Sequence, residues 1–138
     1  MILPYLAYQG NCEEAMALYT SVLGGKIEHL SRFTAETGGP ALAGKVMHMQ
    51  VSFGQGEGAI CCADQEGPVE HGESIKLLVH CASAAEADRI FDALAAQGKA
   101  IQRLTPHPPP DDGGLGALVQ DKYGYVWILT APNDRAGR

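Results

Sequence analysis

The chain has 138 residues, a formal net charge of −6 and a hydrophobic fraction of 46%. This length suits one domain, or two half-domains that share a core. The acidic balance argues against nucleic acid and anionic membranes as partners, because both require a basic surface. No apolar run reaches the roughly 18 residues of a membrane-spanning helix, and the N-terminus lacks the basic region of a signal peptide, so we expect a cytoplasmic protein.

The first predicted helix follows a short strand at 2–8 and covers about residues 12–23. Asn11 is a good N-cap, and Glu14 lies three residues later, where its side chain can reach back to the backbone N–H of the cap. Glycines at 24 and 25 end the helix, since glycine readily takes the left-handed conformation of helix ends. Apolar residues at helical spacing form one face: Ala15, Met16, Leu18, Tyr19, Val22 and Leu23.

The same pattern returns 72 positions later, which is the offset between Asn11 and Ser83. Ser83 and Glu86 repeat the cap and the acidic residue, and Gly98 closes the second helix. Its apolar face consists of Ala87, Ile90, Phe91, Leu94 and Ala95. Two unrelated helices with ordinary caps are the alternative, because such caps are common. We favour an internal duplication, since cap, carboxylate and apolar face share one spacing.

Strands fill the rest of each module. The first module, residues 1–66, is predicted to continue with strands at 26–33, 46–53 and 59–63. The second module, residues 67–138, is predicted to contain strands at 74–81, 100–104, 115–120 and 125–130. The segment 34–45 is rich in glycine, alanine and threonine and is interpreted as a flexible loop. Gly124 suits a tight hairpin before the last strand, because it can take a positive φ.

Polar residues alternate with apolar ones along the strand at 46–53. His48, Gln50 and Ser52 take one side, and Met47, Met49, Val51 and Phe53 take the other. The polar side would line a ligand cavity if the sheet curves around one, and would otherwise be a solvated face. In the matching strand of the second module, His80 shares a face with Lys76 and Leu78. Trp127 belongs to the core or to a pocket wall.

Other candidates are weaker. Glycines at 54, 56 and 58 follow a strand, but a nucleotide or methyl-donor site would need a helix next, so we interpret them as turn glycines. His107, near Asp111 and Asp112 in a Pro-rich loop, is either a lid residue or, as we favour, a solvated one. His29 and His71 lie in exposed-looking stretches and receive no role.

The four cysteines are expected to be buried and reduced, since they show no C-x-x-C spacing and three lie in apolar runs. They are Cys12, Cys61, Cys62 and Cys81. Neighbours along a strand point to opposite faces, which argues against a disulfide between Cys61 and Cys62.

Three segments resemble the PhnB-like branch of the vicinal-oxygen-chelate (VOC) superfamily: PYLAYQGNCEEAMALYTSVLGG, KVMHMQVSFG and DKYGYVWIL. This superfamily includes glyoxalase I, bleomycin-resistance proteins and extradiol dioxygenases. The resemblance covers about residues 3–131. It implies an α+β fold of tandem βαβββ repeats, in which curved mixed sheets form a cup that holds a ligand. It also implies a homodimer.

In the metalloenzymes of this superfamily, ligands come from the first and last strands of each half. The resemblance maps these positions to Leu3 or Pro4, to Cys61 or Cys62, to 74–76 and to 127–129. None carries His, Asp or Glu. We therefore expect neither the superfamily's metal nor another cofactor.

The resulting hypothesis is a metal-free protein that binds a small molecule. The residues expected to line its pocket are His48, Gln50, Cys62, His80 and Trp127. One alternative is a metal-dependent lyase, isomerase or dioxygenase with non-standard ligands such as His48, Cys62 and His80. A third possibility is an interaction module that uses only its dimer surface.

Overall fold

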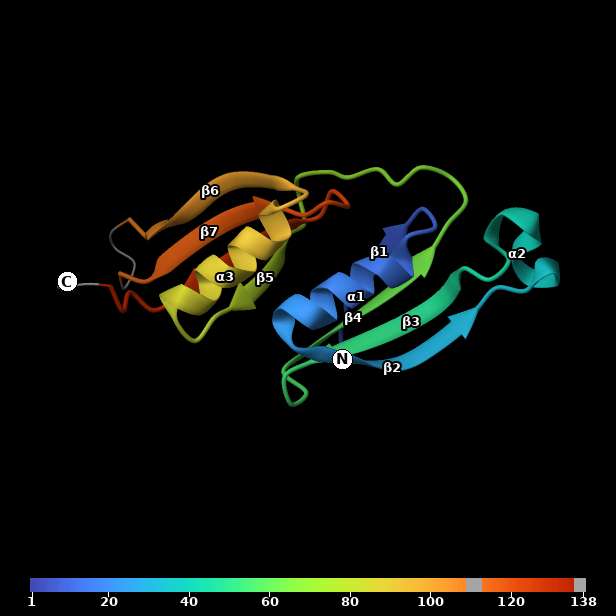
Figure 1. Ribbon diagram of the computed structural model, residues 1–138, viewed down its shortest axis with the longest axis horizontal. Helices are drawn as coiled ribbons and strands as arrows, with labels where there is room; N and C mark the ends of the chain where they lie inside the picture. Colours follow the sequence, from blue (N-terminus) through green and yellow to red (C-terminus); the bar gives the residue numbers. More distant parts are fainter. Residues whose placement is uncertain (109–112, 136–138) are drawn as a thin grey trace. The chain divides into compact units, whose positions relative to one another are not determined.

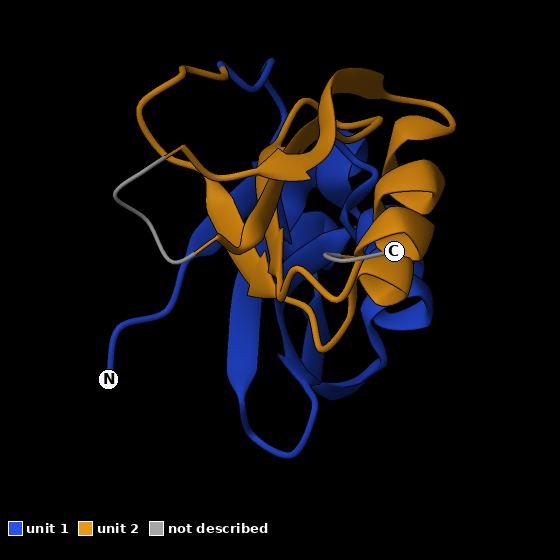
Figure 2. Cartoon of the chain, turned by 90° about the vertical axis from the view of Figure 1, so that its left-hand side faces the viewer, with its two compact units in different colours: residues 1–70 blue, residues 71–138 orange. Residues whose placement is uncertain are grey.

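The chain divides into two compact units, which we call unit 1, Met1–Glu70, and unit 2, His71–Arg138 (Figure 2). The structure is a computed structural model in which residues 1–108 and 113–135 are described. The predicted boundary between residues 66 and 67 falls in the segment that precedes the first strand of unit 2. Within the described ranges, no helix has both the length and the apolar character needed to cross a membrane.

Unit 1 is a four-stranded mixed sheet with one long helix packed on one face (Figure 1). Its elements are β1 (Tyr5–Tyr8), α1 (Cys12–Leu23), β2 (Gly25–Arg32), α2 (Ala35–Leu42), β3 (Val46–Phe53) and β4 (Gly58–Asp64). The strand order is β1-β4-β3-β2; β1 pairs parallel to β4, and the other pairs are antiparallel. Helix α1 packs on β2, β3 and β4.

Unit 2 repeats this topology. Its elements are β5 (Leu77–His80), α3 (Ala84–Ala95), β6 (Lys99–Pro106), β7 (Leu115–Gln120) and β8 (Val126–Ala131). The strand order is β5-β8-β7-β6, with β5 parallel to β8. Both β5 and α3 begin 72 positions after their counterparts β1 and α1. The predicted α+β fold of tandem βαβββ repeats is confirmed.

The start of α1 is held by a carboxylate from β4 and not by the predicted cap. The Asn11 side chain makes no capping hydrogen bond. Instead, Asp64, which is 5% exposed, accepts the backbone N–H of Cys12 at 2.9 Å and that of Val46 at 2.9 Å. A carboxylate at this helix end is also favoured by the helix dipole. Asn11 occupies the N-cap position as predicted, but its side chain does not cap the helix, because the capping carboxylate lies on a strand distant in sequence. The predicted end at Gly24 is confirmed by its φ of 74°.

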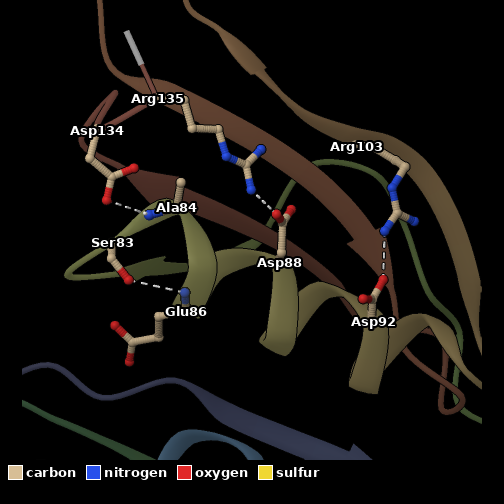
Figure 3. Close-up of polar contacts among 8 residues, drawn as sticks. All are labelled: Ser83, Ala84, Glu86, Asp88, Asp92, Arg103, Asp134 and Arg135. Atoms are coloured by element: carbon tan, nitrogen blue, oxygen red, sulfur yellow. Dashed lines mark hydrogen bonds and ion pairs between the residues drawn. The ribbon is translucent and has the colours of Figure 1, made fainter. Parts of the chain in front are cut away.

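The start of α3 combines a local cap with a distant one (Figure 3). Ser83 accepts the Glu86 N–H, as predicted, while the Glu86 carboxylate accepts the Ala82 N–H. Asp134, which follows β8, accepts the Ala84 N–H at 3.3 Å. In both units an aspartate near the last strand therefore binds the first N–H of the helix.

Two local predictions differ from the structure, and one strand residue is more exposed than its neighbours. Segment 34–45 contains helix α2, because Thr34 and Thr37 form a reciprocal capping box, and Gly39 kinks the helix at φ 68°. Gly98 is not a left-handed helix end; it is a close-approach position, since a Cβ there would overlap the Gln120 carbonyl oxygen. Met47 is 40% exposed although it shares a side with buried Met49, and the β2–β3 register shifts near this end of β3.

The glycine-rich turns are confirmed. Gly54 and Gly56 have φ of 59° and 81° and connect β3 to β4, so the G-x-G-x-G pattern forms a hairpin turn. Gly124 has φ 99° and its N–H donates to the Asp121 carbonyl, as a tight turn before β8 requires.

Replacing the buried carboxylate tests how far unit 1 depends on it. Asp64→Asn should lower the free energy of unfolding by about 2–4 kcal/mol, because an amide offers one acceptor oxygen and turns a donor toward the second N–H. Urea unfolding followed by far-UV circular dichroism measures the loss. Asp92→Asn is the matched control, since Asp92 only forms an exposed ion pair with Arg103 and should cost below about 1 kcal/mol. Equal losses in the two variants would contradict the role of Asp64.

Candidate functional site

One face of the unit 1 sheet is covered by α1, and the other carries the polar residues. Tyr8 donates its hydroxyl to Tyr19 of α1, and Cys62 contacts Cys12 of the same helix, so these strand residues face the helix. Because side chains alternate along a strand, their neighbours point the other way. We call this opposite side the open face of unit 1.

A row of polar side chains crosses all four strands of the open face. Tyr5 of β1 pairs with Cys61 of β4, Cys61 pairs with Gln50 of β3, and Gln50 pairs with His29 of β2. His48 lies next to this row on β3. Paired residues on neighbouring strands place their side chains on the same face. The register therefore collects two imidazoles, a phenol, an amide and a thiol from four separate segments.

Direct contacts join these groups. The Tyr5 hydroxyl lies 2.9 Å from Nδ1 of His48, and the His48 and His29 rings have centroids 5.5 Å apart. The Cys61 thiol donates to the Gln50 amide oxygen at 3.7 Å. Partial burial raises the pKa of the Tyr5 phenol, and burial likewise raises the pKa of Cys61. Both groups thus stay protonated and able to donate near neutral pH.

Of the predicted site residues, His48 and Gln50 lie on this face, whereas Cys62 does not. Cys62 is fully buried, with its Sγ 2.7 Å from that of Cys12. The hydrogen bond to Cys62, together with burial, raises the pKa of the Cys12 thiol. All four cysteines are buried and free, as expected. Because His48 and Cys62 point to opposite faces of one sheet, the suggested metal site of His48, Cys62 and His80 does not fit the structure.

In unit 2, His80 lies on the sheet face opposite α3. Its Nδ1 is 2.6 Å from the Thr130 hydroxyl. A Cβ at Gly116, the β7 partner of Thr130, would lie 2.6 Å from Nε2 of His107. His107 is therefore half-buried against the sheet, on the same face as His80, and the favoured view of it as a solvated loop residue was wrong. Asp111 and Asp112, named with His107 as a lid, lie outside the described residues.

Trp127 lies under α3, on the covered face. It is 2% exposed, and its indole N–H donates to the carboxylate of buried Asp121 at 2.9 Å. The other carboxylate oxygen accepts the backbone N–H groups of Tyr123 and Tyr125. This placement favours a packing role for Trp127, with Asp121 tying the β7–β8 turn to the core.

A cavity of about 270 Å³ lies elsewhere in unit 1. Its lining residues are Gly10, Glu13, Ala43, Gly44, Lys45, Val46 and Asp64. Its charged groups already have partners: Arg32 binds Glu13 with two hydrogen bonds of 3.0 and 2.8 Å, and Lys45 donates to the Gly10 carbonyl. The hydrogen bond from Arg32 lowers the pKa of Glu13. The open face offers more groups to a ligand than this cavity does.

The metal positions that the resemblance assigned do not offer a suitable set of donors. Trp127 and Leu129 are buried apolar residues, and Cys62 is engaged with Cys12. Residues 74–76 contribute no imidazole or carboxylate, and the Lys76 amine donates to the Glu73 carbonyl. Across residues 1–108 and 113–135, no three His, Cys, Asp or Glu side chains converge as metal ligands.

The paired βαβββ units define a protein of the glyoxalase/bleomycin-resistance class. Solved structures with this fold include FosX from Listeria monocytogenes, a fosfomycin resistance protein complexed with Mn(II) and sulfate (11% identity, TM-score 0.63, covering 98% of this chain and 93% of that one). A second is a glyoxylase/bleomycin resistance protein/dioxygenase domain from Frankia (13% identity, TM-score 0.63, covering 100% and 93%). At such identities the likeness concerns the fold alone.

The family follows from a match over residues 1–130 to the model of 3-demethylubiquinone-9 3-methyltransferase. The chain belongs to this PhnB-like family of the VOC superfamily. It is similar to a PhnB protein from Bacillus cereus that carries the same methyltransferase name (28% identity, TM-score 0.76, covering 94% and 98%) and to protein PA1353 from Pseudomonas aeruginosa (26%, TM-score 0.74, covering 96% and 97%). No curated protein matches the chain.

A double-mutant cycle tests the packing role of Trp127. Trp127→Phe should destabilise the protein by about 1–3 kcal/mol, because it leaves one buried carboxylate oxygen of Asp121 without its donor. Asp121→Asn should then cost less in the Trp127→Phe background than in the native chain. Circular dichroism is the readout, since Trp127 is the sole tryptophan and its fluorescence disappears. Strictly additive losses would contradict the coupling.

Proposed function

We propose that the protein binds a small molecule on the open face of unit 1, without the metal ligands of the superfamily's metalloenzymes. The observation that carries the proposal is the row of Tyr5, Cys61, Gln50 and His29 beside His48, on a sheet face that α1 leaves uncovered. Binding needs a few placed polar groups that fix the orientation of a ligand, and this face supplies them. It needs no cofactor and no nucleic-acid or membrane partner.

The side chains of this face favour a flat ligand with hydrogen-bonding groups. The Tyr5 ring and the two imidazoles offer planar surfaces, and the Gln50 amide offers a donor and an acceptor. The charged side chains lie toward the β2 edge of the sheet. There Ser52 donates to the Glu28 carboxylate at 2.6 Å, and the Lys26 amine lies 3.6 Å from the same carboxylate. Small aromatic acids and amides fit this combination.

Methyl transfer, which the family's name describes, is not part of this proposal. A methyl donor would be expected at a glycine-rich turn that leads into a helix N-terminus. In this chain the G-x-G-x-G glycines connect two antiparallel strands.

A ligand screen followed by one substitution tests the proposed site. Fragments of the aromatic acid and amide class are screened by amide NMR shifts with EDTA present, and the best hit is titrated. His48→Ala should weaken that hit about tenfold or more, since it removes the central imidazole of the face. Asp92→Asn, which alters an exposed ion pair of unit 2, should leave the dissociation constant unchanged. Unchanged affinity in His48→Ala, or shifts confined to the cavity at Gly10 and Lys45, would rule out this site.

We also propose that two copies of the chain form a homodimer, as the resemblance implies. Several large apolar side chains are exposed, and association of two copies would remove apolar surface from water. Those in unit 2 are Ile75, Leu78 and Ile101. Sedimentation equilibrium should give twice the chain mass of 14.6 kDa. A monomer at concentrations of about 100 μM would contradict the proposal.

A further inference from the structure

Two histidines of unit 1 approach each other from neighbouring strands. His29 is exposed on β2, His48 is half-buried on β3, and their ring centroids are 5.5 Å apart with an interplanar angle of 49°. The sequence offers no hint of this pair, since 18 residues separate the two positions along the chain, as their numbers show. Only the β2–β3 register, in which His29 pairs with Gln50 and Ser31 with His48, places them on one face.

The spacing matches two imidazoles that share one ion. A metal–imidazole bond of about 2.1 Å puts each ring centroid about 3.2 Å from the ion. Two rings then have centroids about 4.5 Å apart at the roughly 90° angle of nickel or copper sites, and about 5.2 Å apart at the tetrahedral angle of zinc sites. The observed 5.5 Å lies close to the tetrahedral value. The distance between the two rings is therefore compatible with one shared ion.

Tyr5 supports one of the two rings through a hydrogen bond between its hydroxyl and the imidazole of His48. Its oxygen lies 2.9 Å from Nδ1 of His48. Histidines that bind metals generally donate their other ring N–H to an oxygen, which fixes the tautomer and the ring orientation. When Nδ1–H of His48 donates to Tyr5, the Nε2 lone pair of His48 is available to an ion.

We propose that His29 and His48 form a binding site for a late first-row divalent transition metal, with Tyr5 as the positioning residue for His48. Imidazole ligands suit nickel, copper and zinc, whereas magnesium and calcium prefer oxygen ligands. Two protein ligands leave the remaining coordination positions to water or to a ligand's oxygen atoms. The site differs from the positions that the resemblance assigns to the superfamily's metal, since none of those lies on β2 or β3.

The inference extends the proposed function by giving the bound molecule an ion to coordinate, yet it can be tested without any such molecule. Chelator-treated protein is titrated with Ni²⁺ and then with Mg²⁺ by isothermal calorimetry. We expect one Ni²⁺ per chain and no heat from Mg²⁺. His29→Ala and His48→Ala should each weaken Ni²⁺ binding about tenfold or more, because either leaves a single imidazole. Tyr5→Phe should weaken it by a smaller factor while both histidines remain.

His80→Ala is the matched control, because His80 is also an exposed strand histidine whose Nδ1 lies beside a hydroxyl, that of Thr130. It should retain the native affinity for Ni²⁺. An independent measurement on the native chain uses substoichiometric Cu²⁺, which should broaden the imidazole NMR signals of His29 and His48 before those of His80. Three results would overturn the site: no stoichiometric Ni²⁺ binding, full affinity in both alanine variants, or equal broadening of all three histidines. Fragment binding to the open face is measured in the presence of EDTA. A failure of Ni²⁺ to bind would therefore leave that test of the ligand site unaffected.

Discussion

The structure depends on one constraint: each four-stranded sheet has two faces, and in the described part of the chain one helix packs on each sheet. Helices α1 and α3 cover one face of their sheets and bury the apolar residues that the 3.6-residue periodicity marks. The opposite faces then carry the alternate strand residues, which these helices do not cover. In unit 1 these are largely polar, which is why that face is a candidate site and the helix-covered face is not.

Each unit has a buried aspartate that connects secondary-structure elements within that unit, and the two aspartates act at different places in the fold. Asp64 joins the end of β4 to the first turn of α1 and to the start of β3, while Asp121 joins the β7–β8 turn to the indole of Trp127. A carboxylate removed from water is tolerated only where donors surround it, and both residues accept backbone N–H groups. These polar contacts fix the ends of elements that hydrophobic packing alone leaves free to slide.

The candidate site shows which of its residues a sequence pattern can predict and which it cannot. His48 and Gln50 were predicted to share a polar strand face, because alternation is a local property. Tyr5, Cys61 and His29 were missed, because their proximity depends on strand order and register. Cys62 and Trp127 were expected to line the pocket, but their side chains lie on the helix-covered faces of the sheets. A register prediction for β4 and β3 would have separated Cys62 from Cys61 and Gln50, whereas Trp127 lies on β8 of unit 2.

Local chemistry determined the elements of this protein. Both long helices, the hairpin at Gly124 and the apolar faces follow from spacing, caps and glycine conformations that involve neighbours within a few residues, and the duplication follows from the return of that pattern 72 positions later. Tertiary structure alone decided which strands pair, which aspartate caps α1, and that two histidines from different strands meet. The physical reason is that hydrogen-bonded pairing between distant strands sets side-chain neighbours, and no periodicity within one segment encodes the register of its partner.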